Sequence, residues 1–167
     1  MKISAFVVSV VALTVAASPA VAKSSQDFIK DAIQGDISET MLGRLAARSG
    51  SSQEVKDFGH MLVADHTKAR REAAAVARKL GVKPPTHAMV AADAEYAKLQ
   101  VLTGTSFDKE FVWYMVKDHQ TDISEFEEEA RAEDGPASKL AEKQLPTLHK
   151  HLEHAQSLAT TLSASNQ

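Results

Sequence analysis

The chain has 167 residues, a formal net charge of −3 and no cysteine. This length fits one domain, and the missing cysteines exclude disulfide bonds and a lipid-anchored leader. The mildly acidic balance gives no support to a nucleic-acid partner, which needs a basic face. Aromatic residues make up only 5% of the chain, alanine is abundant, and β-branched runs are absent after the N-terminal segment. Composition therefore predicts an all-α protein.

The N-terminal segment has the features of an export signal. Lys2 precedes an apolar run over residues 3–17, and Ala20-Val21-Ala22 forms a small-residue cleavage site. We therefore predict a cleaved signal peptide over residues 1–22, a single domain over residues 23–167 and a periplasmic location. The alternative, an uncut membrane anchor, requires a longer apolar span, and no second apolar run follows.

Two long helices are predicted first, over residues 25–48 and from Ser51 to about residue 80. Apolar residues at spacings of three and four give each helix a buried stripe. Glu39 falls on the stripe of the first helix and His66 on that of the second. Ser51 and Glu54 form a capping box at the start of the second helix, and Gly81 is its predicted C-cap.

The outer side of the second helix is basic. We interpret this side as a solvated face, because neighbouring acids and the acidic net charge argue against a basic binding patch. The basic residues are Lys56, Lys68, Arg70, Arg71, Arg78 and Lys79.

Pro84-Pro85 interrupts the pattern, and a weaker helix over residues 88–102 is predicted within a crossover. Residues 106–133 form the next long helix, capped by Thr105 with Asp108. Its buried stripe contains His119, with Asp122 one turn further on.

The last helix is predicted over residues 137–162. His151 lies on its inner face, while His149 points away and His154 sits at the edge. Pro146 falls inside this helix and predicts a kink or a restart. Four long helices joined by short turns and one long crossover predict a four-helix bundle.

The sequence Val63-Ala64-Asp65-His66 has a second copy in Val116-Lys117-Asp118-His119. Both copies lie in the middle of a long helix, so we expect His66 and His119 to face each other across the bundle centre.

The inward polar residues suggest a metal site in the bundle core, because helical bundles build such sites from carboxylates and imidazoles on facing helices. Iron, manganese or zinc would suit this set, and copper less exclusively. Asp65 and Asp118 could support the ligands by accepting hydrogen bonds from the imidazole rings. The candidate ligands are Glu39, His66, His119, His151 and Asp122.

A metal-free polar layer explains the same residues. Buried polar groups need partners, and Glu39 could accept a hydrogen bond from His66 while His119 pairs with His151 or Asp122. The Glu-x-x-His pattern of di-iron proteins is missing, because Val63, Val116 and Leu148 occupy the positions that glutamate would need.

Several segments resemble one bacterial family. They include residues 35–39, 55–58, 61–66, 115–119 and 145–152, and they follow the same order over almost all of the mature chain. The sequence resembles the exported family named domain of unknown function four-one-four-two, whose members are often labelled outer-membrane proteins. The resemblance implies a ferritin-like bundle and supplies no activity. The periplasmic prediction rests on the sequence itself.

Three functions are compatible with the sequence. The first is a metal-binding protein of the cell envelope that protects against stress. The second is a non-catalytic helical module that binds a protein or envelope partner. The third is an enzyme that uses His66 or His119 as an acid-base group, although no activated nucleophile is visible.

Overall fold

The computed structural model describes residues 23–132 and 135–164, and all regular structure in these ranges is helical. The chain forms α1 (Ser25–Ser49), α2 (Gln53–Lys79), α3 (Val90–Gln100), α4 (Gly104–Ala130) and α5 (Pro136–Ala164). The all-α prediction is confirmed. The signal peptide predicted for residues 1–22 lies outside the described residues.

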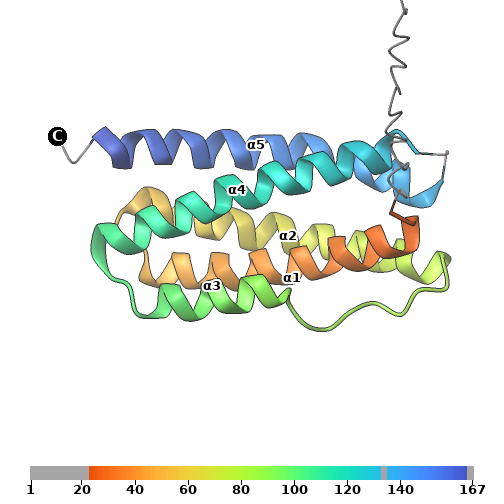
Figure 1. Cartoon of the computed structure of the whole chain (residues 1–167), viewed down its shortest axis with the longest axis horizontal. Helices are drawn as coiled ribbons and strands as arrows, with labels where there is room; N and C mark the ends of the chain where they lie inside the picture. Colours follow the sequence, from red (N-terminus) through yellow and green to blue (C-terminus); the bar gives the residue numbers. More distant parts are fainter. Residues whose placement is uncertain (1–22, 133–134, 165–167) are drawn as a thin grey trace, which may run out of the picture.

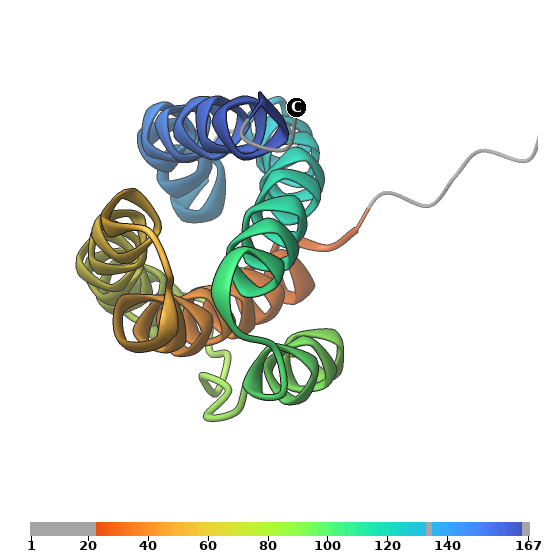
Figure 2. The same cartoon turned by 90° about the vertical axis from the view of Figure 1, so that its left-hand side faces the viewer.

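Two helical hairpins make up the fold (Figure 1). α1 packs along α2, α4 packs along α5, and the hairpins meet where α2 contacts α5 and α1 contacts α4. The end-on view shows α3 on the outside, beside α1 and α4 (Figure 2). The crossover from α2 to α4 therefore runs around the outside and carries α3, as predicted. None of the described helices has a stretch long and apolar enough to cross a membrane.

Two glycines allow α1 and α2 to approach closely. A Cβ atom added at Gly59 would lie 2.6 Å from the carbonyl oxygen of Gly43 and 2.7 Å from the amide nitrogen of Ala47. Any larger residue at position 59 would push the two backbones apart. This contact lies close to Glu39 and His66 along the two helices, so it helps to set how near they come.

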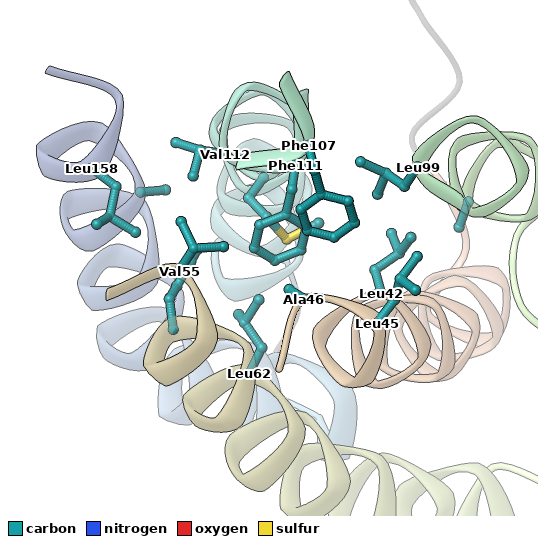
Figure 3. Packing of buried hydrophobic residues seen from close by; sticks show 14 residues of the cluster. Leu42, Leu45, Ala46, Val55, Leu62, Leu99, Phe107, Phe111, Val112 and Leu158 are labelled. Atoms are coloured by element: carbon teal, nitrogen blue, oxygen red, sulfur yellow. The ribbon is translucent and has the colours of Figure 1, made fainter. Parts of the chain in front are cut away.

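The apolar core has two parts. One cluster surrounds Phe58, Phe111 and Leu62 at one end of the helices (Figure 3). The other surrounds Phe28 and Phe126 at the opposite end. Each long helix contributes residues to both clusters, and the inward polar residues of each helix lie between the two contributions. The core is thus interrupted by one buried polar layer.

Two predicted N-caps are wrong. α2 is capped by Ser52, whose hydroxyl accepts from the amide of Val55. Asp108 does not cap α4; its carboxylate accepts from the amides of Ser51 and Ser52 at 2.7 and 2.8 Å. A carboxylate can satisfy two donors at once, so Asp108 serves the α1–α2 turn and holds it against α4.

Two further predictions, the C-cap of α2 and the effect of Pro146 in α5, need smaller corrections. Leu80 is the C-cap of α2, and Gly81 follows it with a φ of 67°, a left-handed conformation that favours glycine. A kink or a restart was predicted at Pro146; α5 continues through this residue as one helix, so a restart does not occur. Pro146 and Glu142 are exposed, and water can therefore satisfy the Glu142 carbonyl that lacks its helical donor.

Candidate metal centre

The buried polar layer brings together one predicted residue from each long helix. Glu39 is 1% exposed, His66 is 3% exposed, and His119 and His151 are fully buried. The ring centroids of His66 and His119 are 5.8 Å apart. The prediction that these two histidines face each other is confirmed.

His66 is held by two carboxylates of α1. Its Nδ1 lies 2.9 Å from Asp36 Oδ1 and 2.9 Å from Glu39 Oε2. Because Nδ1 donates a proton to these acceptors, Nε2 is the nitrogen that can bind a ligand after it loses its own proton, and it is buried without a hydrogen-bond partner among the described residues. Asp36 was not among the predicted site residues, although its position one turn before Glu39 on the same helix was a usable signal.

His119 and His151 are each fixed through one ring nitrogen. His119 Nδ1 donates to the Met115 carbonyl at 3.0 Å, and His151 Nε2 donates to Asp65 Oδ2 at 3.0 Å. When neutral, each ring therefore keeps a lone pair on its other nitrogen. These two nitrogens, His119 Nε2 and His151 Nδ1, are 3.3 Å apart, so the two lone pairs point into the same space.

This arrangement suits a cation. One ring nitrogen from each of His66, His119 and His151 lies within 4.8 Å of the other two. Glu39 Oε1 lies 3.2 Å from His119 Nε2 but makes no hydrogen bond within the part of the chain that the structure describes. Ring nitrogens fixed from behind by a carboxylate or a carbonyl are typical of metal-binding histidines.

Charge in the layer centres on Glu39 and His66. Burial alone would raise the pKa of Glu39, but the nearby His66 and His119 lower it to about 2. Burial opposes a charge on His66, yet Glu39 and Asp36 raise its pKa well above the usual value. Without a metal, Glu39 and His66 therefore form a buried ion pair.

The other two histidines are neutral. Burial lowers the pKa of His119. Burial, together with the charge on His66, lowers the pKa of His151 to about 4. Both rings can bind a metal without first losing a proton.

The remaining predicted site residues occupy different positions. Asp65 contacts His151, as described above. Asp118 has a carboxylate oxygen within 4.8 Å of ligand atoms of Glu39 and His119, whereas Asp122 belongs to none of the metal-sized groups of the described residues. Burial and the charge on Glu39 raise the pKa of Asp118 to about 7 and that of Asp122 well above its usual value.

A cavity of about 90 Å³ reaches the layer from outside. Its wall includes the buried Asp36, Glu39 and His66 as well as the more exposed Glu72 and Lys143. The last two form an ion pair at 2.9 Å, with Lys143 largely exposed. The cavity therefore connects the buried layer with the surface between α2 and α5, and Asp122 also lines it.

These features define a class of helical protein with a buried layer of imidazoles and carboxylates. The chain belongs to the domain of unknown function family DUF4142, whose family model matches residues 10–158. The family resemblance seen in the sequence is thus confirmed. Among curated proteins, none matches the chain.

Two solved structures are similar to this fold. One is the crystal structure of a DUF305 fragment from Deinococcus radiodurans, with a TM-score of 0.72 and 14% identity over 82% of this chain and 95% of that one. The other is CopM in the Cu(II)-bound form, with a TM-score of 0.68 and 14% identity over 82% of this chain and 96% of that one. At such low identity, the likeness shows the fold alone.

Proposed function

We propose that this protein binds one divalent transition-metal ion in the buried polar layer. His66 Nε2, His119 Nε2 and His151 Nδ1 are the proposed ligands, and Glu39 Oε1 is the fourth. One observation carries the proposal: His119 Nε2 and His151 Nδ1 lie 3.3 Å apart, while the other nitrogen of each ring donates to Met115 or Asp65 and leaves a lone pair on both facing atoms when the rings are neutral. Two facing lone pairs repel each other, and a cation between the rings would replace this repulsion with two metal–nitrogen bonds.

The donor set favours copper or zinc over the iron and manganese that the sequence first suggested. Imidazole suits copper and zinc, and Cu(II) binds most strongly among the divalent first-row ions. The similar fold of CopM, solved in a Cu(II)-bound form, supports copper as the first ion to test. Asp36, Met115 and Asp65 would then orient the ligands, and Asp118 would supply an additional carboxylate near His119.

The same proposal includes a periplasmic location and a protective role for the protein. The leader-like segment, with Lys2, an apolar run and Ala20-Val21-Ala22, supports export to the periplasm. The two packed hairpins and the family resemblance support a ferritin-like bundle. A buried site of this kind would hold a reactive metal ion away from other molecules of the envelope, which is a protective role under metal or oxidative stress.

A structural role for the layer is the second candidate. It is favoured by the contacts of His66, whose Nδ1 already has two carboxylate partners at 2.9 Å. In this case the layer fixes the register of the helices without any metal, and the protein acts as a helical module for a partner in the envelope.

Isothermal titration separates the two candidates. Purified protein without a His tag is freed of metal and titrated with Cu(II), Zn(II), Fe(II) and Mn(II). We expect one Cu(II) per chain, and no binding in this site by His66→Gln, His119→Gln or Glu39→Gln. His149→Gln is the matched control, because His149 is exposed two residues before His151.

The structural role predicts a different pattern. The wild type would take up no metal, and each of the three core variants would lose roughly 1–3 kcal/mol of stability because its partners are stranded. That pattern would rule out the metal proposal. An unchanged Cu(II) stoichiometry in the core variants would show that Cu(II) binds at a site other than this layer.

A further inference from the structure

A groove on the outer side of α1 gathers four arginines. It has a volume of about 550 Å³, and Tyr96 of α3 forms part of its wall. Arg44 and Arg48 come from α1, one turn apart, and Arg70 and Arg71 are neighbours on α2. The groove thus collects positive charge from two helices of a chain whose net charge is −3.

The charge of these arginines is not neutralised by direct ion pairs. No ion pair joins any of the four to a carboxylate within residues 23–132 and 135–164. Like charges one turn apart on a helix are destabilising. Arg44 and Arg48 therefore repel each other, whereas the charge of Arg70 has a favourable electrostatic interaction with Asp36.

A residue with a buried hydroxyl lines the same groove. Thr40 is 7% exposed, and its Oγ1 has no hydrogen-bond partner among the described residues. Hydroxyls inside helices commonly donate to the carbonyl four residues earlier, as Ser38 does to Gln34 at 2.7 Å. Thr40 makes no such bond, but its Oγ1 is shielded from solvent and is therefore not open to the groove. Thr67 lines the groove as well.

We propose that this groove binds a ligand with two or more phosphate groups, held by the four arginines. Guanidinium groups match phosphate oxygens with paired hydrogen bonds, and they remain charged at every physiological pH. Two pairs of arginines on separate helices fit two phosphates better than one. Arg70 and Arg71, which the sequence placed on a solvated face, thereby gain a function together with Arg44 and Arg48.

The proposal does not depend on the metal centre. The groove is lined by Ile37, Thr40 and Met41 on the outer side of α1, whereas Glu39 points inward from the same helix. A free oligophosphate and a phospholipid headgroup share the required chemistry, so the experiment has one arm for each source.

The first arm uses calorimetry with inorganic tripolyphosphate on chelator-treated protein at constant ionic strength. We expect saturable binding that weakens at least tenfold in the double variant Arg44→Gln/Arg70→Gln. Arg78→Gln, an exposed change on α2 that leaves the groove lining unaltered, is the matched control and should bind normally.

The second arm measures co-sedimentation with phosphatidylglycerol vesicles, with phosphatidylcholine vesicles as the uncharged comparison. Binding to the anionic vesicles alone that is lost in the double variant would identify a lipid headgroup as the source. The proposal is overturned if neither probe binds. It is also overturned if Arg78→Gln weakens binding as much as the double variant, because the attraction would then come from diffuse charge.

Discussion

Replacing Gly59 with alanine tests whether the close approach of α1 and α2 holds the fold and the polar layer together. The new methyl group would lie 2.6 Å from Gly43 O and 2.7 Å from Ala47 N. Both contacts are with backbone, so the helices themselves must separate. Overpacking of this kind costs roughly 1–3 kcal/mol or more, while the better helix propensity of alanine offsets about 1 kcal/mol.

Gly35→Ala is the matched control. Gly35 lies in the middle of α1, and an added Cβ would meet no atom within 4 Å beyond its chain neighbours and the adjacent turns of its own helix backbone. The same substitution should therefore stabilise the protein by up to ~1 kcal/mol. Urea unfolding followed by circular dichroism measures both variants. The reasoning is refuted if Gly59→Ala is as stable as the wild type, or if Gly35→Ala loses as much stability as Gly59→Ala.

The same variant links packing to the proposed function. His66 lies two turns after Gly59, and Glu39 lies one turn before Gly43 on the facing helix. Separation of the helices would lengthen the contact between His66 and Glu39. We therefore expect Gly59→Ala to bind Cu(II) more weakly than Gly35→Ala in the titration described above.

Three further predictions concern stability. Asp118 keeps its proton up to about pH 7 in the folded chain, whereas the unfolded chain releases it near pH ~4, so the stability of the wild type falls as pH rises between these values. In urea melts, Asp118→Asn should be more stable than the wild type by ~2 kcal/mol or more at pH 8 and nearly equal to it at pH 4. Asp108→Ala should lose ~2–4 kcal/mol of stability, because the amides of Ser51 and Ser52 lose a charged acceptor. The stability of Asp108→Asn should fall between those of the wild type and Asp108→Ala. Equal stability of all three proteins in chemical denaturation would contradict this reasoning. The chelator-treated protein should keep its helical circular dichroism at room temperature, because its two apolar clusters need no metal. Added Cu(II) should raise the melting temperature, because it binds the folded chain. Loss of the helical signal on chelation would contradict the first of these expectations.

The helices and the inward positions were predictable from the sequence for a simple reason. Apolar spacing of three and four records which face of each helix is buried, and Glu39, His66, His119 and His151 each interrupt such a stripe. A polar residue inside a buried stripe must lie in the core. The repeated Asp-His pair also indicates, from its position within each helix, that His66 and His119 lie at matching depths.

Contacts between distant segments were not predictable in the same way. Asp108 looked like a capping residue because it stands three positions after Thr105, but its carboxylate oxygens serve a turn more than fifty residues away. The choice between Asp118 and Asp122 near the proposed metal site depends on small rotations of α4 that periodicity does not resolve. The arginine groove joins residues of α1 and α2 whose side-by-side position appears only after folding.

The division of the core into two apolar clusters has a consequence for how the chain unfolds. Apolar burial contributes most of the stabilising free energy, and here it is concentrated at the two ends of the four long helices. The two apolar clusters are connected through the helix backbones and through the polar contacts around His119. If those contacts are removed, each end retains its own packed side chains, so opening of one end no longer requires opening of the other. Native-state hydrogen exchange should then divide the molecule into two cooperative units that meet at the middle turns of every long helix.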